Sequence, residues 1–421
     1  MQTINPSTAL RVNSERSRTI KFYTLGCKAN QYDTQSIRER FLSNGYKEIN
    51  NGRSSSNYLI NTCTVTAAAD RKSHNIIRHY IRENPRAKII ITGCLVEKDN
   101  ASLAKIKGID FIISKRFFPD GISNFSGHTR AFLKIQDGCN NFCAYCKVPL
   151  VRGASRSRQL EEIISEAKRL VKNGFKEIVL TGICLGAYGQ DLSDKTNLVS
   201  LIEALEKIEG LLRIRLSSIE AGDVNNDLIK KMVSSPKLCR HLHIPIQSGD
   251  DEILKNMNRS YRAKDYLKLI RKIKKYIADI AITTDILVGF PSETETNFQN
   301  TVNLIKKVTP LRTHIFPYSP RQGTLAAEKF GKKQIDYKII QSRLEYLKKI
   351  ADHCSLNFKR KFLKKTMNVL IEERADKQGF WQGHTDNYIK VLVKSKLNLK
   401  NKLVRVRLKE IQKAYIFAGL P

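Results

Sequence analysis

The 421-residue sequence predicts an α/β protein with three domains. We expect an N-terminal α/β domain with a parallel sheet at residues 20–125, a central partial βα barrel at 131–357 and a small β-barrel at 358–421. Three observations favour this division. Apolar runs alternate with helical patterns in the first two regions, a polar stretch rich in Gly, Ser and Asn at about 119–130 separates them, and short β runs divided by turns fill the last region.

Three short apolar runs in the N-terminal region each stop at a cysteine, at 21–27, 58–63 and 89–94. Helical patterns lie between them, so the strands should be parallel and their carboxyl ends should meet at one edge of the sheet. We therefore expect Cys27, Cys63 and Cys94 to converge, although they lie far apart in the sequence. That geometry suits a cluster with three thiolate ligands. The alternative, a small buried residue beside a glycine turn, explains one cysteine better than three.

A second set of cysteines, Cys139, Cys143 and Cys146, has CxxxCxxC spacing within DGCNNFCAYC. Three thiolates on a tight loop can hold three corners of a four-iron cluster and leave the fourth iron without a protein ligand. A zinc site normally closes with a fourth Cys or His, and the nearest upstream histidine, His128, lies beyond the apolar run 131–135. If the motif stood alone, a structural metal knuckle or incidental thiols would remain alternatives.

The central region repeats strand and helix in the order that a partial βα barrel needs. Strands are predicted at 177–181, 212–217, 241–246, 280–288 and 312–316, with helices at 160–171, 198–208 and 266–277. Ligands of such barrels bind at the carboxyl ends of the strands. The segment 289–295 predicts a helix start with Ser292 as N-cap and Glu295 in a capping box. We expect Cys184, Cys239 and Cys354 to be packing residues, and His241 and His243 likewise.

The chain is strongly basic, with 74 Lys and Arg against 40 Asp and Glu and a formal net charge of +34. This charge favours a polyanionic partner, unless it reflects only the biased composition of an AT-rich genome. Residues 358–421 hold 16 Lys and Arg against 5 Asp and Glu, which suits phosphate-backbone binding on a small barrel. Phe380 and Trp381 either stack on a base or fill the core of that barrel.

The first 19 residues are polar, and no apolar run reaches membrane-spanning length. Nine cysteines in a chain of this length do not suggest a disulfide scaffold. We expect a soluble, monomeric, cytoplasmic protein with reduced thiols and no membrane partner.

The motifs TLGCKANQYD at 24–33, NTCTVT at 61–66 and TGC at 92–94, followed by the CxxxCxxC loop, resemble the methylthiotransferase family of radical S-adenosylmethionine (SAM) enzymes. The resemblance runs from about Lys21 to the C-terminus. The first motif is most similar to the branch that acts on threonylcarbamoyladenosine in transfer RNA, whereas the isopentenyladenosine branch usually reads closer to YGCQMN. The basic C-terminal region resembles the TRAM domain, an RNA-binding module.

The resemblance implies a chemistry and a set of site residues. It implies two [4Fe-4S] clusters, on Cys27, Cys63 and Cys94 and on Cys139, Cys143 and Cys146, together with SAM and a methylthio transfer to carbon 2 of N6-threonylcarbamoyladenosine next to the anticodon. The residues expected to contact SAM are Thr181, Gly182, Ser217, Glu220, Gln247 and Asp285. Those expected to contact transfer RNA are Arg152, Arg156, Arg158 and Arg321, although the first three also fit a solvated loop.

A low-potential electron donor of the flavodoxin or ferredoxin type is implied as a further partner. Three alternatives stay open at this point. The acceptor is isopentenyladenosine in transfer RNA, or it is an aspartate of a ribosomal protein, or the chain is a non-catalytic RNA-binding iron-sulfur sensor.

Overall fold

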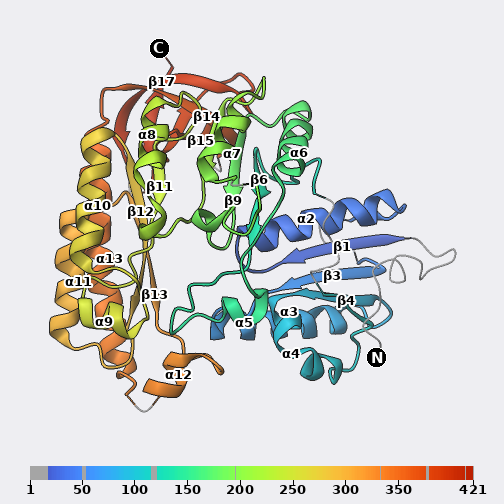
Figure 1. Cartoon of the computed structure of the whole chain (residues 1–421). Coiled ribbons are helices and arrows are strands. Elements are labelled where there is room, and N and C mark those ends of the chain that lie inside the picture. Colours follow the sequence, from blue (N-terminus) through green and yellow to red (C-terminus); the bar gives the residue numbers. More distant parts are fainter. Residues whose placement is uncertain are drawn as a thin grey trace. The chain divides into compact units, whose positions relative to one another are not determined.

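The computed structural model describes residues 18–49, 54–114, 121–194, 196–331, 333–375, 379–412 and 414–420 (Figure 1). Most of the polar N-terminal stretch and the start of the predicted stretch at 119–130 lie outside these ranges. The chain divides into two compact units. One comprises residues 1–126, 137–142 and 146–156, and the other comprises 127–136, 143–145 and 157–421.

The first unit contains a five-stranded sheet in the order β2-β1-β3-β4-β5, with every neighbouring pair parallel. Its strands are β1 (Thr19–Thr24), β2 (Lys47–Glu48), β3 (Asn57–Thr62), β4 (Lys88–Gly93) and β5 (Phe111–Ile112). Its helices are α2 (Lys28–Ser43), α3 (Ala67–Glu83), α4 (Cys94–Ala104) and α5 (Val148–Arg152). The predicted parallel sheet is therefore confirmed.

Both faces of this sheet are covered, which explains why its strands are apolar throughout. Tyr58 and Ile60 of β3 pack with Ile77 of α3 on one face. Leu59 points to the opposite face and packs with Phe41 of α2. Successive strand residues alternate between faces, so one strand contributes to both cores.

The second unit contains the partial barrel, whose six strands run in parallel in the orders β6-β9-β10 and β11-β12-β13. Parallel bridges from Ile214 to Leu238 and from Ser218 to His243 connect the two halves. The strands are β6 (Arg130–Lys134), β9 (Glu177–Thr181), β10 (Arg213–Leu216), β11 (His241–His243), β12 (Ala281–Val288) and β13 (Arg312–Pro317). The predicted partial barrel is confirmed, although β11 is shorter than the predicted strand at 241–246.

Helices cover the outside of the barrel (Figure 1). They are α6 (Leu160–Lys172), α7 (Leu198–Glu206), α8 (Asn226–Ser234), α9 (Asp251–Asn256), α10 (Ala263–Tyr276), α11 (Glu295–Val308) and α13 (Tyr337–Arg360). Helix α12 (Leu325–Phe330) lies below β13 in this view, and the 3₁₀ turns η2 (Leu185–Ala187) and η3 (Ala221–Asp223) follow β9 and β10. The short strands β7 (Gln136–Asp137) and β8 (Arg156–Ser157) pair with each other and flank the cysteine loop.

The predicted capping box at Ser292 is wrong. Helix α11 begins at Glu295, with Thr294 as N-cap and Asn297 completing the capping box. Ser292 has a φ of 68° and lies in the turn before the helix. The buried Glu293 explains the later start, because its carboxylate accepts from the Gly289 amide at 2.9 Å and from Arg343 of α13 at 2.9 Å.

The C-terminal region is a closed barrel in the order β14-β15-β16-β18-β17. Its strands are β14 (Thr366–Arg374), β15 (Phe380–Thr385), β16 (Lys390–Lys394), β17 (Leu403–Ile411) and β18 (Ile416–Gly419). The short β runs at 367–371, 388–393, 403–408 and 414–418 predict four of them, and none covers β15, which contains Gly383. A Cβ at Gly383 would lie 2.1 Å from the Leu370 carbonyl oxygen, so the close approach of two strands requires glycine there.

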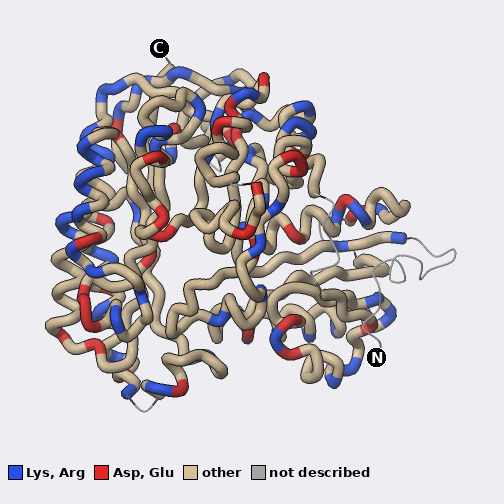
Figure 2. The backbone as a smooth tube through the Cα atoms, in the orientation of Figure 1, with Lys and Arg blue, Asp and Glu red and all other residues tan. Residues whose placement is uncertain are grey.

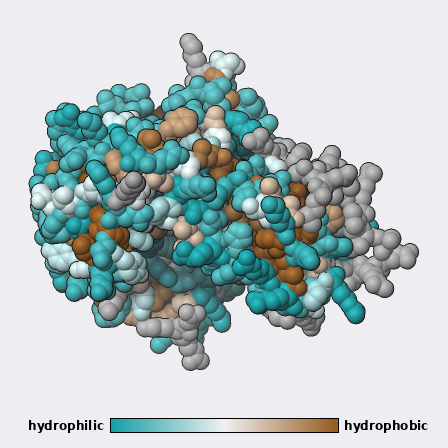
Figure 3. Space-filling view, turned by 90° about the horizontal axis from the view of Figure 1, so that it is seen from below, coloured by the Kyte–Doolittle hydropathy of each residue, from teal (hydrophilic) through white to brown (hydrophobic). Residues whose placement is uncertain are grey.

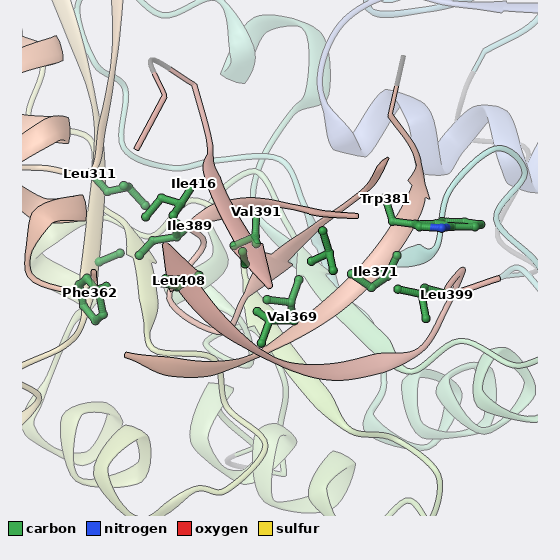
Figure 4. Close-up of a cluster of buried hydrophobic side chains, with 14 of the residues drawn as sticks. Leu311, Phe362, Val369, Ile371, Trp381, Ile389, Val391, Leu399, Leu408 and Ile416 are labelled. Atoms are coloured by element: carbon green, nitrogen blue, oxygen red, sulfur yellow. The ribbon is translucent and has the colours of Figure 1, made fainter. Parts of the chain in front are cut away.

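Trp381 belongs to the core of this barrel, together with Val369, Ile371 and Leu399 (Figure 4). Its side chain is 5% exposed, and the Arg374 guanidinium lies over its ring at 5.3 Å. Of the two predicted roles, core packing is therefore the one that the structure supports for Trp381.

The C-terminal barrel is docked to the amino ends of β6, β9 and β10 by buried charge. Glu177, the first residue of β9, is fully buried and pairs with Arg215 at 2.7 Å and with Arg213 at 3.7 Å. Arg213 donates to the His384 carbonyl at 2.9 Å, and Arg215 donates to the Asp386 carbonyl at 2.9 Å. These arginines therefore bridge a carboxylate of one domain and carbonyls of the next.

Surface composition agrees with the basic sequence. Lys and Arg recur along α10, α13 and the C-terminal barrel (Figure 2). The face in Figure 3 is mostly hydrophilic, with apolar residues in separate patches. None of the helices in the described part of the chain has the length and apolar character needed to cross a membrane.

Candidate metal centre and cofactor site

The cysteines of the first unit stand at the carboxyl ends of three adjacent parallel strands. Cys27 is the N-cap of α2, Cys63 follows β3 directly, and Cys94 is the first residue of α4. Burial raises the pKa of the Cys63 thiol to about 11, and the neighbouring Cys94 and Cys27 contribute to this rise. A Cβ on Gly26 would lie 3.1 Å from the Cys63 sulfur. The fold therefore brings the three thiols together, as expected from the parallel sheet.

Asn30 of α2 connects the three strand ends. Its amide nitrogen donates to the carbonyls of Leu25 at 2.7 Å and Thr62 at 3.0 Å. Its amide oxygen accepts from the Cys94 thiol at 3.7 Å. One buried side chain is thus bonded to the segments that carry Cys27, Cys63 and Cys94. No local pattern marks this role, because Asn30 is three residues from the nearest cysteine and two of its partners, Thr62 and Cys94, are distant in the chain.

Arg152 is buried beside this cysteine group. Its guanidinium donates to Asp137 at 2.8 Å, to Asp33 at 3.3 Å and to the Asn30 amide oxygen. Only 1% of its side chain is exposed. Burial opposes its charge, yet Asp137, Cys94, Asp33 and Cys27 hold the pKa of Arg152 well above its ordinary value. This environment argues against the predicted phosphate contact of Arg152 and places a fixed cation beside the thiols.

The CxxxCxxC loop straddles the boundary between the units, with Cys139 and Cys146 in the first and Cys143 in the second. Within the first unit, amides two residues further on donate to each sulfur: Asn141 to Cys139 and Val148 to Cys146, both at 3.4 Å. Such donors stabilise thiolates and tune clusters. The loop is tight, because Gly138 has a φ of 75° and a Cβ there would lie 1.9 Å from the Ala154 carbonyl oxygen.

Cys143 contacts an arginine that the sequence reasoning missed. The Arg259 guanidinium donates to the Cys143 sulfur at 3.1 Å and pairs with Glu220. Burial opposes this charge, but Tyr261, Tyr145, Glu220 and Cys143 raise the pKa of Arg259. No local pattern marks Arg259, since it lies 116 residues from Cys143 in the chain.

The predicted SAM residues lie in the second unit. All except Asp285, which stands in the middle of β12, lie at or within a few residues of the carboxyl ends of barrel strands. Thr181 ends β9, and Gly182 follows it. A Cβ added to Gly182 would lie 3.0 Å from the side-chain oxygen of Gln136. Gln247 adopts a φ of 64° and bridges to β12. Asp285 of β12 lies 3.2 Å from the His243 ring nitrogen.

Two features of this region fit SAM. The hydroxyl of Ser217 is buried and has no hydrogen-bond partner among the described residues, so it can bond a polar group of a ligand. Glu220, Asp285 and Arg259 add charges that can bind amino and carboxylate groups.

The other predicted RNA contacts differ in exposure. Arg156 is exposed, and Arg158 pairs with the buried Glu166 at 2.7 Å. Arg321 is 7% exposed. Arg156 is therefore the predicted contact with the most accessible charge.

Among the described residues, no three His, Cys, Asp or Glu side chains surround one point as a single metal ion requires. A four-iron cluster differs in this respect, because each thiolate binds its own iron. The converging thiols, the amides directed at sulfur and the buried cation fit such a cluster.

Comparisons with known proteins place these features in a family. Three family models match the chain. The model described as "Radical SAM superfamily" matches residues 133–305, "Uncharacterized protein family UPF0004" matches 19–114 and "TRAM domain" matches 360–420. The structure resembles that of the radical S-adenosylmethionine methyltransferase TsrM from Kitasatospora setae, with a TM-score of 0.52, 13% identity and coverage of 74% of this chain and 78% of that one. This is a likeness of fold.

Curated relatives match almost the whole chain. "Threonylcarbamoyladenosine tRNA methylthiotransferase MtaB" of Bacillus subtilis is 38% identical, over 93% of each chain, and its namesake from Thermotoga maritima is 36% identical over 89% of this chain and 91% of its own. "tRNA-2-methylthio-N(6)-dimethylallyladenosine synthase" of Thermotoga petrophila is 31% identical over 86% of this chain and 88% of its own. With relatives of this identity and coverage, and with cysteines at the expected strand ends, the chain belongs to the methylthiotransferase family of radical SAM enzymes.

Proposed function

We propose that this enzyme adds a methylthio group to carbon 2 of N6-threonylcarbamoyladenosine next to the anticodon of transfer RNA. The observation that carries the proposal is the meeting of Cys27, Cys63 and Cys94 around Asn30, in a chain with relatives of 36–38% identity that carry this activity in their names. That carbon has neither an acidic proton nor a leaving group, so radical chemistry is needed.

As a member of the family, the enzyme uses two [4Fe-4S] clusters and SAM. We assign one cluster to Cys27, Cys63 and Cys94 and the other to Cys139, Cys143 and Cys146. When bound, these groups supply the electron, the hydrogen-abstracting radical and the methylated sulfur that the reaction needs. The chain contributes thiolate ligands, fixed charges and a shaped site.

Within that site, Asn30 holds the three strand ends in register, and Arg152 offsets the negative charge of the thiolates beside it. Arg259 acts on the other set through Cys143 and orients Glu220. We assign SAM binding to Thr181, Gly182, Ser217, Glu220, Gln247 and Asp285, with Ser217 donating the hydroxyl that is unpaired in the described structure.

We assign RNA contacts to Arg156, Arg158 and Arg321 and to the basic C-terminal barrel. The three domains are proposed at 20–125, 131–357 and 358–421. We further propose that the protein is a cytoplasmic monomer that receives electrons from a flavodoxin or ferredoxin type of donor.

Anaerobic reconstitution, followed by assay on transfer RNA with and without the threonylcarbamoyl group, tests the proposal. Methylthio product should form only on the modified RNA. Cys143→Ala should abolish SAM cleavage, whereas Cys63→Ala should still cleave SAM without making product. Cys354→Ala, which removes a buried thiol outside both sets, is the control and should keep both activities. Product formation by Cys63→Ala would refute the assignment of the second cluster.

The same assay separates the alternatives. If product forms on RNA that carries isopentenyladenosine and none forms on threonylcarbamoyladenosine, the acceptor is isopentenyladenosine. This acceptor appears in the name of the relative that is 31% identical. About four iron atoms per chain without SAM turnover would indicate an RNA-binding sensor instead of an enzyme.

A further inference from the structure

A cavity of about 340 Å³ lies in the second unit where β13 and α13 meet the C-terminal barrel. Arg312 and Thr313 come from β13, Asp352 and Lys359 from α13, and Tyr388 and Lys390 from the loop and first residue of β16. Both domains thus contribute side chains to its wall. Its volume lies at the lower end of the range for ligand sites.

The cavity carries excess positive charge. Three cations, Arg312, Lys359 and Lys390, face one carboxylate, the exposed Asp352. Lys359 is only 5% exposed, and burial together with the neighbouring Arg312 lowers its pKa. Buried like charges repel, so an anion bound between them would be stabilised by the cations and would relieve their repulsion.

A donor without a partner adds to this charge. The hydroxyl of Thr313 is buried and makes no hydrogen bond with any described residue. Buried hydroxyl groups normally have a partner. Two lysine ammonium groups, a guanidinium and a hydroxyl can together donate to the oxygens of a phosphate.

The position of the cavity constrains which phosphate it can bind. Arg312 is the first residue of β13, and Asp285, a proposed SAM contact, pairs with His314 two residues further along. Measured along the strand at about 3.3 Å per residue, the cavity lies about 7 Å from the level of Asp285 and about 16 Å from the carboxyl end of β13 at Pro317. A phosphate bound there lies at the amino end of the strand, whereas ligands of such barrels bind at the carboxyl ends.

The docking of the two domains keeps the cavity in one shape. Arg130 pairs with Glu372 of β14 at 3.2 Å, and Tyr388 lies under the guanidinium of Arg215 at 4.8 Å and under that of Arg312 at 5.5 Å. The residues that line the cavity are therefore held by the same contacts that join the domains.

We propose that this cavity binds a backbone phosphate of the transfer RNA, held by Arg312, Lys359, Lys390 and the Thr313 hydroxyl. The proposal rests on the proposed function, since a transfer RNA substrate supplies the phosphate. The site is not a surface of the C-terminal barrel alone, because six of the ten residues that line it precede residue 358. It anchors the substrate at a distance from the chemistry.

The test is the salt dependence of transfer RNA affinity for Lys390→Gln, with Lys359→Gln as a second variant. Loss of one phosphate contact should reduce the slope of log affinity against log salt by about 0.7 to 0.9. We expect KM to rise about 3- to 10-fold with kcat unchanged, because a remote anchor contributes to binding alone. Lys230→Gln is the matched control, since it removes the same charge from a side chain that is 80% exposed on α8.

A slope for both cavity variants that equals that of Lys230→Gln would overturn the proposal. Inorganic phosphate is the probe for the alternative that the cavity binds a free anion instead of an RNA phosphate. If phosphate raises the melting temperature of the wild type but not of Lys390→Gln, while the RNA slope is unchanged, the cavity binds free anions and the RNA assignment is wrong. If the slope changes as expected but no methylthio product forms, the anchor stands and the proposed function fails.

Discussion

Replacing Glu177 with Gln tests whether buried charge locks the C-terminal barrel to the βα barrel. Glu177 is fully buried and lies 2.7 Å from Arg215, 3.7 Å from Arg213 and 3.8 Å from Arg130. The variant keeps the shape of the side chain but removes the one carboxylate that these three arginines share in common. Arg213 and Arg215 then lose this carboxylate partner at the junction of the domains, whereas Arg130 keeps Glu372 at 3.2 Å.

The size of the effect follows from the ionisation of Glu177. Burial alone would raise its pKa, but Arg215 and Arg130, with a smaller contribution from Arg213, lower it from 4.5 to about 2. A shift of this size corresponds to about 3 kcal/mol of stabilisation at neutral pH. Removing one partner of a buried ion pair costs about 3–5 kcal/mol. We therefore expect Glu177→Gln to lower the free energy of unfolding by about 3–5 kcal/mol at pH 7.

The pH dependence gives an independent check. Because the folded-state pKa of Glu177 lies below 4.5, the ionised carboxylate stabilises the folded chain above about pH 4.5, and this contribution disappears as the pH falls toward 2. The difference in stability between wild type and variant should therefore be largest at neutral pH and shrink in acid.

Urea unfolding of the protein without cofactors measures this effect. Trp381 is the single tryptophan and lies in the core of the C-terminal barrel, so its fluorescence reports the domain that Glu177 anchors. The control is Glu162→Gln, which removes a carboxylate that is 60% exposed and 3.7 Å from Arg158, and which should change stability by less than about 1 kcal/mol. A loss for Glu177→Gln no larger than that of the control would refute the reasoning.

Two further predictions concern the clusters. Arg152→Gln removes the cation between Asp33 and Asp137. Methylthio product per SAM cleaved should fall several-fold, and the reduction potential of the Cys27, Cys63 and Cys94 cluster should become more negative. An unchanged potential would contradict this role. Gly138→Ala should lose about four iron atoms per chain on reconstitution, because its Cβ would lie 1.9 Å from the Ala154 carbonyl oxygen. Gly153→Ala, with a φ of 74° and open space at its Cβ, carries the same backbone strain and should keep its iron. Equal iron contents in both glycine variants would rule out the steric explanation.

The sequence alone was sufficient to locate the main parts of this protein. Strands that stop at Cys27, Cys63 and Cys94 alternate with helices, and this order makes the sheet parallel and directs all three cysteines to one edge. Short β runs separated by turns likewise located four strands of the C-terminal barrel. These conclusions depend on local patterns and on a topological rule, so they need no knowledge of individual contacts. The missed strand β15 contains Gly383. Glycine is required there because the neighbouring strand β14 approaches too closely for a Cβ, a contact that the sequence pattern does not reveal.

The roles of the charged side chains were decided only by the tertiary structure. Arg152, Arg156 and Arg158 look alike in the sequence, yet Arg152 is buried against Asn30, 122 residues away, whereas Arg156 is exposed. Arg259 reaches Cys143 across 116 residues. An arginine can bind phosphate, balance a thiolate or join two domains, and its side chain is suited to each. Which it does depends on the partners and the burial that folding supplies, and these are set by distant parts of the chain.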